Sequence, residues 1–309
     1  LYSVPVPAQT GVSNTSVTMN AASMENSGFE FSATYRNRDH ALKYDISANV
    51  STLKNKVTSL GIGKDSYISG AYATYVGQEI GQFYGWVYKG IARTQEDLDN
   101  NAVQQGANVG DCLYEDISGP DGTPDGVIDA YDQTVLGSGL PKVNFGLSTH
   151  LEYKGFDLNI STYGVLNYHV SDDIYNSLNS CYGYGNKEVG MLDANRWSED
   201  GSTYLSSVPR TYAANNATLA WNDLFSSRKI QNAAYWKIAN VELGYNFPDK
   251  WFGGYVNGVR LYVSAQNLYT FTGYHGYNVD YAGGTFTPGY NFCSFPSART
   301  FMCGLHFTF

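Results

Sequence analysis

The stretch 300–309 alternates between two kinds of side chain. Successive side chains of a β-strand point to opposite faces, so the alternation separates them into two series. The apolar series is Phe301, Cys303, Leu305, Phe307 and Phe309. The mostly small or polar series is Thr300, Met302, Gly304, His306 and Thr308. A transmembrane β-barrel strand needs this pattern, with its apolar face toward lipid and its polar face toward the lumen.

Six further stretches alternate in the same way. They are 28–36, 41–51, 143–153, 156–167, 235–247 and 259–269. Each is about long enough to cross a bilayer at a tilt. In 235–247, a strict period of two places one series on a single face: Tyr235, Lys237, Ala239, Val241, Leu243, Tyr245 and Phe247. The expected fold class is all-β, a transmembrane antiparallel β-barrel; a soluble β-sandwich with one wet face is the alternative.

The connections between these strands alternate in length. Residues 37–39, 154–155 and 248–257 are short, whereas 53–141, 168–234 and 270–297 are long. Outer-membrane barrels place short turns in the periplasm and long loops outside. Counting back from the last strand, every short turn falls on the periplasmic side and every long loop outside. Seven strands cannot close a barrel around such loops, so we expect further strands before Leu1.

Composition narrows the class of protein. Charged residues are 15% of the chain, below the roughly 25% of an ordinary soluble domain. The net charge of −9 argues against nucleic acid as a partner, because phosphate contacts need clustered Lys and Arg. No C-x-x-C spacing supports a zinc or redox site, and a disulfide among Cys112, Cys181 and Cys293 stays open.

The stretch 121–132 follows the spacing of a calcium-binding loop. Its oxygen donors would be Asp121, Thr123, Asp125, the carbonyl of Val127, Asp129 and Asp132. Gly126 allows the sharp turn, and Ile128 would pin the loop to its neighbours. No flanking helix pattern is evident, so we expect a structural cation that stiffens an external loop. An acidic Gly-Pro turn without a metal is the alternative.

Aromatic side chains gather in the long loops. The candidates for contact with a substrate or partner are Tyr84, Trp86, Tyr88, Tyr182, Tyr184, Tyr274 and Tyr277. Such rings could bind sugars or peptides, but packing of the loops on each other or on a partner is favoured. The five histidines are scattered, and neither Gly-x-Ser-x-Gly nor His-Glu-x-x-His occurs, so we expect no enzymatic activity.

Several motifs occur in a characteristic order. An acidic stretch at 116–132 and Pro141 precede Tyr153-Lys154-Gly155-Phe156-Asp157-Leu158. Further motifs lie at 81–90, Arg196-Trp197, 237–248, 263–274 and 296–301. Together they resemble the SusC-like (RagA-like) TonB-dependent transporters over nearly the whole chain. One departure is an insertion at 120–124, which leaves open whether Asp116 or Asp121 is the first calcium ligand.

The resemblance implies a barrel of roughly 22 strands with an N-terminal plug, of which this chain would supply about the last third. It also implies a SusD-like surface lipoprotein as a lid, energy from the TonB complex through an N-terminal segment, and Phe309 as a signal for barrel assembly. Oligosaccharides or peptides would be imported across the outer membrane of Bacteroidetes-type Gram-negative bacteria. A soluble or secreted glycan-binding module with the same calcium loop, and a passive porin, are the alternatives.

Overall fold

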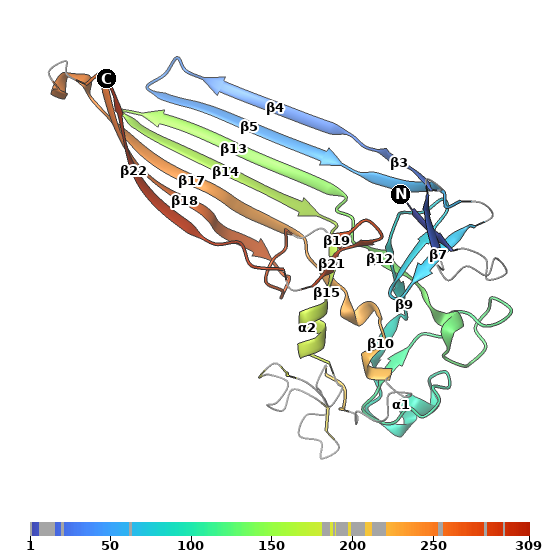
Figure 1. Ribbon diagram of the computed structural model, residues 1–309. Helices are drawn as coiled ribbons and strands as arrows, with labels where there is room; N and C mark the ends of the chain where they lie inside the picture. Colours follow the sequence, from blue (N-terminus) through green and yellow to red (C-terminus); the bar gives the residue numbers. More distant parts are fainter. Residues whose placement is uncertain are drawn as a thin grey trace.

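One antiparallel sheet of seven long strands dominates the computed structural model (Figure 1). The structure describes residues 2–5, 16–19, 22–61, 64–180, 186–187, 189, 197–198, 208–211, 221–252, 256–280, 283–292 and 294–309. The long strands are β4 (Glu30–Asn37), β5 (Leu42–Thr52), β13 (Val143–Tyr153), β14 (Phe156–Leu166), β17 (Tyr235–Phe247), β18 (Gly258–Thr272) and β22 (Thr300–Thr308). Each pairs with the next long strand along the chain, in the order β4-β5-β13-β14-β17-β18-β22. All seven predicted strands are confirmed.

The short connections gather at one end of the sheet (Figure 1). The β13–β14 turn consists of Lys154 and Gly155, whose φ angles are 48° and 87°. Two consecutive positive φ angles give a tight turn that matches the right-handed twist of the paired strands. The β17–β18 connection contains a short 3-10 helix, η6 (Asp249–Phe252). The long connections leave from the opposite end, so the predicted alternation of short and long connections is confirmed in space.

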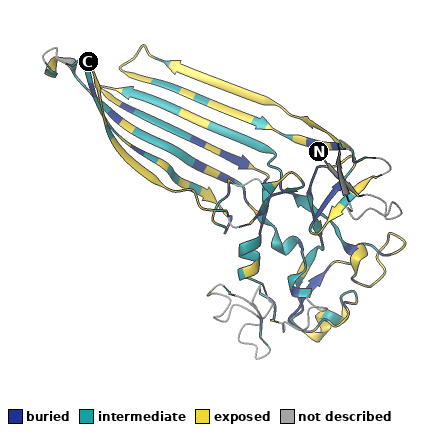
Figure 2. Cartoon of the chain, in the orientation of Figure 1, coloured by how far each residue is buried: buried dark blue, intermediate teal, exposed yellow. Residues whose placement is uncertain are grey.

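The apolar face of the sheet is open to the surroundings. Large apolar side chains on it include Leu147, Leu243, Val263 and Leu305, which are 40–53% exposed. Within the described residues, no second layer covers this face (Figure 2). Water-soluble proteins rarely expose so large a continuous apolar area, so lipid is its natural neighbour. Among the described residues, no helix is long and apolar enough to cross a membrane.

A bulge interrupts the alternation in β17. Ser161 of β14 pairs with Asn240, but the next residue of β14, Thr162, pairs with Ile238. Ala239 is therefore an extra residue in β17. An extra residue in one strand bends it and reverses the faces of the side chains beyond it.

The bulge corrects one prediction from the sequence. Lys237 lies on the polar inner face and is 4% exposed, whereas Trp236 lies on the outer face and stacks on Phe271 at 5.3 Å between ring centroids. The expectation that Tyr235 and Lys237 share a face with Val241 is therefore wrong. A pattern of strict period two cannot reveal where a strand gains a residue.

The long connections fold into small sheets beyond the end of the large sheet that lies opposite the short turns (Figure 1). Four of their strands form a sheet in the order β12-β9-β8-β7, and β15 lies between β16 and β21. The bounds of the short strands are β1 (Tyr2–Pro5), β2 (Ser16–Met19), β3 (Ser23–Ser27), β6 (Lys54–Ser59), β7 (Ser66–Ser69), β8 (Tyr72–Tyr75), β9 (Gln82–Gly85), β10 (Tyr88–Ile91), β11 (Cys112–Tyr114), β12 (Thr134–Ser138), β15 (His169–Asp172), β16 (Gln231–Asn232), β19 (Gly283–Gly284), β20 (Thr287–Pro288) and β21 (Tyr290–Asn291). The helices are α1 (Gln95–Asp99), η2 (Ala130–Asp132), α2 (Asp173–Leu178), η4 (Trp221–Asp223) and η5 (Ser227–Lys229). We call the described parts of the connections 53–141, 168–234 and 270–297 the loop assembly.

Among the described residues, three apolar clusters hold the loop assembly together, and the first of them also joins it to β14 and β17. The first contains Val165, Tyr168, Val170, Ala233, Tyr235, Tyr274 and Val279. The second contains Val57, Leu60 and Ile80. The third contains Cys112, Tyr114 and Ile128, and burial raises the pKa of the Cys112 thiol to about 12. Cys112 and Cys303 are free thiols, whereas Cys181 and Cys293 lie outside the described residues.

The orientation of the sheet predicts opposite effects for two neighbouring substitutions in the middle of β13. Leu147→Arg places a charge on the outer face and should lower the free energy of unfolding in lipid by about 2–4 kcal/mol. Ser148→Arg places the same charge on the polar inner face and should leave it nearly unchanged. Urea unfolding of the intact protein in lipid vesicles measures both. Equal destabilisation by the two variants would contradict the assigned faces.

Candidate functional site

Ion pairs cross the inner face of the sheet near the short turns. Arg260 of β18 donates through Nε to the Asp157 carboxylate at 2.9 Å and through Nη2 to Glu242 at 2.7 Å. Asn246 donates to the same Asp157 carboxylate at 2.9 Å. A Cβ atom at Gly244 would lie 2.5 Å from Arg260, so glycine leaves room for the guanidinium. These contacts join β14, β17 and β18 through charged side chains.

Charged and polar side chains also contact one another on the inner face of the neighbouring strands β5, β13 and β14. Lys43 of β5 pairs with Glu152 of β13 at 3.2 Å. His150 Nε2 lies 2.9 Å from a Glu152 carboxylate oxygen, and its Nδ1 lies 2.7 Å from the Asn159 side-chain oxygen. The inner face is therefore a polar, charged wall that suits water and hydrophilic solutes, as the alternating pattern predicts.

A loop is fastened to the other end of the inner face. Lys237 donates to the Asp280 carboxylate at 2.6 Å, and its ammonium lies 5.9 Å from the centroid of the Tyr163 ring. The Tyr163 hydroxyl donates to the other Asp280 oxygen at 3.4 Å. The bulge at Ala239 turns Lys237 inward, and this orientation allows Lys237 to pair with Asp280. Nothing in the spacing of the sequence identified Asp280.

A second buried network joins β15 to the loop that follows β18. The Tyr274 hydroxyl donates to the Asp172 carboxylate, and the Asn291 amide donates to the Tyr274 oxygen at 2.7 Å. The other Asp172 oxygen accepts the Tyr175 backbone amide and caps α2. Burial and the neighbouring carboxylate raise the pKa of Tyr274. Tyr274, a candidate contact with a substrate, is 6% exposed and lies inside the loop assembly.

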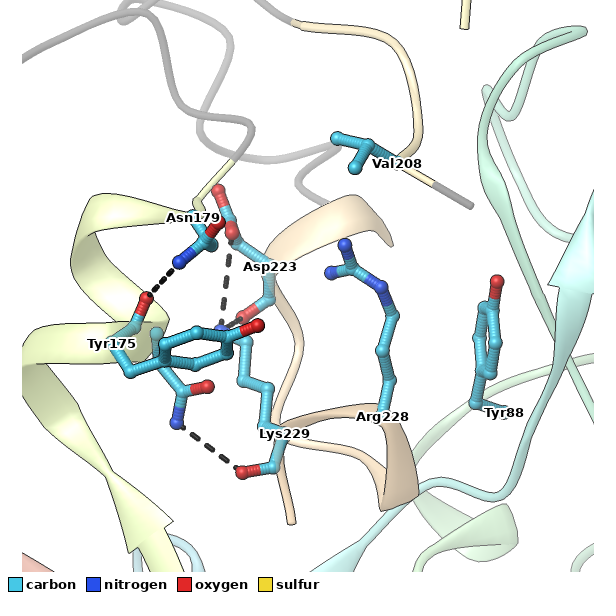
Figure 3. Close-up of a pocket in the computed structure, with 8 residues that line it drawn as sticks. Tyr88, Tyr175, Asn179, Val208, Asp223, Arg228 and Lys229 are labelled. Atoms are coloured by element: carbon cyan, nitrogen blue, oxygen red, sulfur yellow. Dashed lines mark hydrogen bonds and ion pairs between the residues drawn. The ribbon is translucent and has the colours of Figure 1, made fainter. Parts of the chain in front are cut away.

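The aromatic residues of 84–88 lie on β9 (Tyr84), between β9 and β10 (Trp86) and at the start of β10 (Tyr88). Tyr84 packs beside Tyr75, and burial raises its pKa to about 12. The Trp86 indole donates to the Asp129 carbonyl at 2.9 Å, which connects it to the acidic loop. The Tyr88 ring lines a pocket together with residues of α2 and η5 (Figure 3). All three side chains therefore have structural contacts, since Tyr88 packs against the cluster of Cys112, Tyr114 and Ile128, and Tyr88 also borders a space that a ligand could occupy.

Of the four other sequence candidates, two are described by the structure. Tyr277 is 64% exposed in the loop assembly, and Phe309 is 84% exposed beside Phe307 at the short-turn end of the sheet. Tyr182 and Tyr184 lie outside the described residues.

The acidic loop 116–132 is folded by its own carboxylates. Asp132 is fully buried and accepts the backbone amides of Ile117, Ser118 and Asp129 at 2.8–3.2 Å. At the other end of the loop, the Asp116 carboxylate accepts the Gly126 amide at 2.7 Å. Both carboxylates therefore close the loop on itself.

The turn features expected of the loop are present. Gly126 adopts a positive φ of 83°, and Ile128 is buried in the cluster with Cys112 and Tyr114. Asp121, Thr123, Asp125, Val127 and Asp129 are exposed.

The acidic loop does not form a preformed calcium site in this structure. Among the described residues, no three His, Cys, Asp or Glu side chains converge on a point where a metal ion could be held. Asp116 and Asp132 already accept backbone amides, so part of their capacity to act as ligands is in use. The choice between Asp116 and Asp121 as the first ligand is not decided by these contacts.

Similarity to known proteins extends over the whole chain. It is 30% identical to TonB-dependent receptor P3 of Formosa agariphila and 26% identical to TonB-dependent receptor SusC of Bacteroides thetaiotaomicron, and each match covers 100% of the chain. The chain spans 31% and 29% of the lengths of these relatives. No family model matches the chain.

Solved structures share the fold. A structure of the RagAB peptide transporter matches 98% of the chain with a TM-score of 0.76 and 22% identity, and the chain covers 31% of it. The RagAB peptide importer in its open-open state matches with a TM-score of 0.73 and 22% identity, over 99% of the chain and 31% of that structure. The resemblance to SusC-like TonB-dependent receptors is therefore confirmed, and with it the all-β barrel class and the outer-membrane location.

The attachment of the loop to the sheet can be tested by substitution. Asp280→Ala removes the carboxylate that pairs with the buried Lys237 ammonium, which should cost about 3 kcal/mol. Local opening should then increase roughly a hundredfold, seen as faster hydrogen exchange of the backbone amides of 273–280 in the intact protein. Asp39→Ala, which removes an exposed carboxylate at a short turn, is the matched control. Unchanged exchange in Asp280→Ala would show that this pair does not hold the loop.

Proposed function

We propose that this chain forms part of the wall and the external loop assembly of a SusC-like TonB-dependent importer. The observation that carries the proposal is the similarity to TonB-dependent receptors, SusC among them, along the whole chain. The sheet supports it, because it combines an apolar outer face for lipid with a charged inner face for a hydrophilic passage. The cargo class is oligosaccharides or peptides; the related RagAB is a peptide transporter.

Two partners belong to the proposal. Energy would come from the TonB complex, as the names of the relatives suggest. A SusD-like lipoprotein would cover the external end, where the loop assembly lies beyond the ends of the strands. The chain itself would guide and gate a solute without breaking or forming covalent bonds.

The geometry suggests how the loops and the sheet act together. The loop assembly is fastened to the inner face through Lys237 and Asp280, and to itself through Asp172, Tyr274 and Asn291. A solute that displaced either set of contacts would move a loop that is attached to the wall. Such a coupling between the external surface and the inner face is what a gated importer requires.

Calcium binding by the acidic loop is a separate part of the proposal. The spacing of Asp121, Asp125 and Asp129 supports it, but Asp132 is buried and its carboxylate already accepts three backbone amides, with which an ion would compete. Exchange of existing hydrogen bonds for metal ligands weakens net binding. We therefore expect the affinity of an extracellular calcium module rather than that of a sensor.

Calorimetric titration of the intact protein with calcium tests this expectation. The dissociation constant should be on the order of 10⁻⁴–10⁻³ M. Asp129→Ala should abolish the signal, because it removes one of the oxygen donors at the predicted spacing. Asp65→Ala, which removes an exposed carboxylate elsewhere in the same connection 53–141, should leave it unchanged. A titration without a saturable calcium signal would reject the site.

Energy coupling separates an importer from a passive porin. In cells that carry the complete gene, uptake of labelled peptide and oligosaccharide pools should exceed uptake in a deletion strain and should fall to that background when a protonophore collapses the proton gradient. Entry of a small solute through unrelated porins, measured in the same cells, controls for damage to the membrane. Gene-dependent uptake that persists after the gradient collapses would favour the porin.

A further inference from the structure

A pocket in the loop assembly lies where α2, η5 and β10 meet (Figure 3). Its volume is about 290 Å³. Small-molecule sites of about 300 Å³ and above hold drug-sized ligands, so this one suits a single sugar ring or amino-acid residue. The rings of Tyr88 and Tyr175 contribute to its lining from opposite sides.

The two neighbouring cations of η5 have different surroundings. Lys229 donates to the Asp223 carbonyl at 2.5 Å and lies 3.9 Å from its carboxylate. Arg228 extends between Asp223 and Tyr88, and its guanidinium points into the pocket (Figure 3). Throughout the described part of the chain, no hydrogen bond or ion pair involves that guanidinium. Arg228 therefore has five donors available to a ligand.

The backbone that carries Arg228 is held in place. The Ser227 amide donates to the Trp86 carbonyl at 3.1 Å, and the Ser227 hydroxyl accepts the Tyr88 amide at 3.0 Å. The Lys229 amide closes a turn on the Ser226 carbonyl at 2.9 Å. A guanidinium on a fixed backbone loses less freedom when it binds than one on a mobile loop.

The charge of the pocket favours an anion. Among the described residues that line the pocket, Arg228 and Lys229 accompany one carboxylate, Asp223, whereas the chain as a whole has a net charge of −9. A planar guanidinium matches a carboxylate through two parallel hydrogen bonds, and flanking aromatic rings offer apolar surface to the rest of the ligand. Asn176 and Asn179 of the α2 region also line the pocket. Their amide nitrogens already donate within the protein, so their side-chain oxygens are the groups that can accept from a hydroxyl or peptide N–H of the ligand.

We infer that this pocket binds a carboxylate-bearing unit of the imported solute, with Arg228 as the residue that holds the carboxylate. The inference rests on the proposed import function, because it identifies a chemical feature of the cargo. An acidic sugar and an acidic amino-acid side chain share this chemistry. The two sources are separated by the probes used in the test.

Binding to the intact, detergent-solubilised receptor provides the test, by calorimetry at low salt. The probes are a tri-galacturonate and its methyl ester, and a glutamate-rich peptide and its glutamine counterpart. We expect at least one acidic probe to bind more tightly than its neutral counterpart. Arg228→Gln should weaken that acidic probe at least tenfold and leave the neutral one unchanged.

Two further variants make the result specific. Lys89→Gln removes a cation from the same strand as Tyr88, but Lys89 is exposed and bonded to Asn101 outside the pocket, so binding should be unchanged. Arg228→Lys keeps the charge without the planar fork and should fall between the wild type and Arg228→Gln. Folding of each variant is checked by gel electrophoresis, because a folded barrel migrates more slowly after heating whereas an unfolded one does not change. If Arg228→Gln does not fold, the binding result of Arg228→Lys decides the outcome.

Specific outcomes overturn the inference. Equal affinity of the wild type for acidic and neutral probes would do so, as would unchanged acidic binding in Arg228→Gln or an equal loss in Lys89→Gln. Binding in detergent needs no energy source, so its result is independent of the uptake experiment. If the pocket does not bind the acidic probes, the proposed import function is unaffected. If uptake does not depend on the proton gradient, active import is rejected and the binding result remains valid.

Discussion

Hydrocarbon offers no partner to a backbone amide or carbonyl, so a lipid-facing wall must satisfy these groups within itself. The seven long strands do so by pairing in chain order, each antiparallel to its neighbours. Pairing fixes the period of two, and the period separates a face for lipid from a face for water. The ion pairs of Arg260 and of Glu152 lie on the inner face, where water and other charges can solvate them.

The loop assembly inherits its position from the sheet. The bulge at Ala239 turns Lys237 inward, and Lys237 then holds Asp280 of the connection that follows β18. That connection in turn supplies Tyr274 to the network with Asp172. A one-residue irregularity in a strand therefore fixes how a distant loop lies across the end of the wall.

The long strands were predictable from sequence because eleven or so alternating residues carry a strong periodic signal. The short strands of the loop assembly were not, since β15 or β21 has too few residues for a period to appear. Gly126 and Ile128 were placed correctly by local spacing. Arg228, Asp172 and Asp280 were missed, because their surroundings come from segments far apart in the chain and no local pattern records them.

The parallel pairing of β15 with β21 has a consequence for assembly of the molecule. The two strands lie on either side of the β17–β18 hairpin in the chain, and Ser171 meets Tyr290 only when that hairpin has returned to the same end of the sheet. Contacts between distant segments form late, because a long stretch of chain must be ordered first. The loop assembly can thus reach its final shape only after β17 and β18 are in place, so its resistance to a protease reports that this part of the sheet has formed.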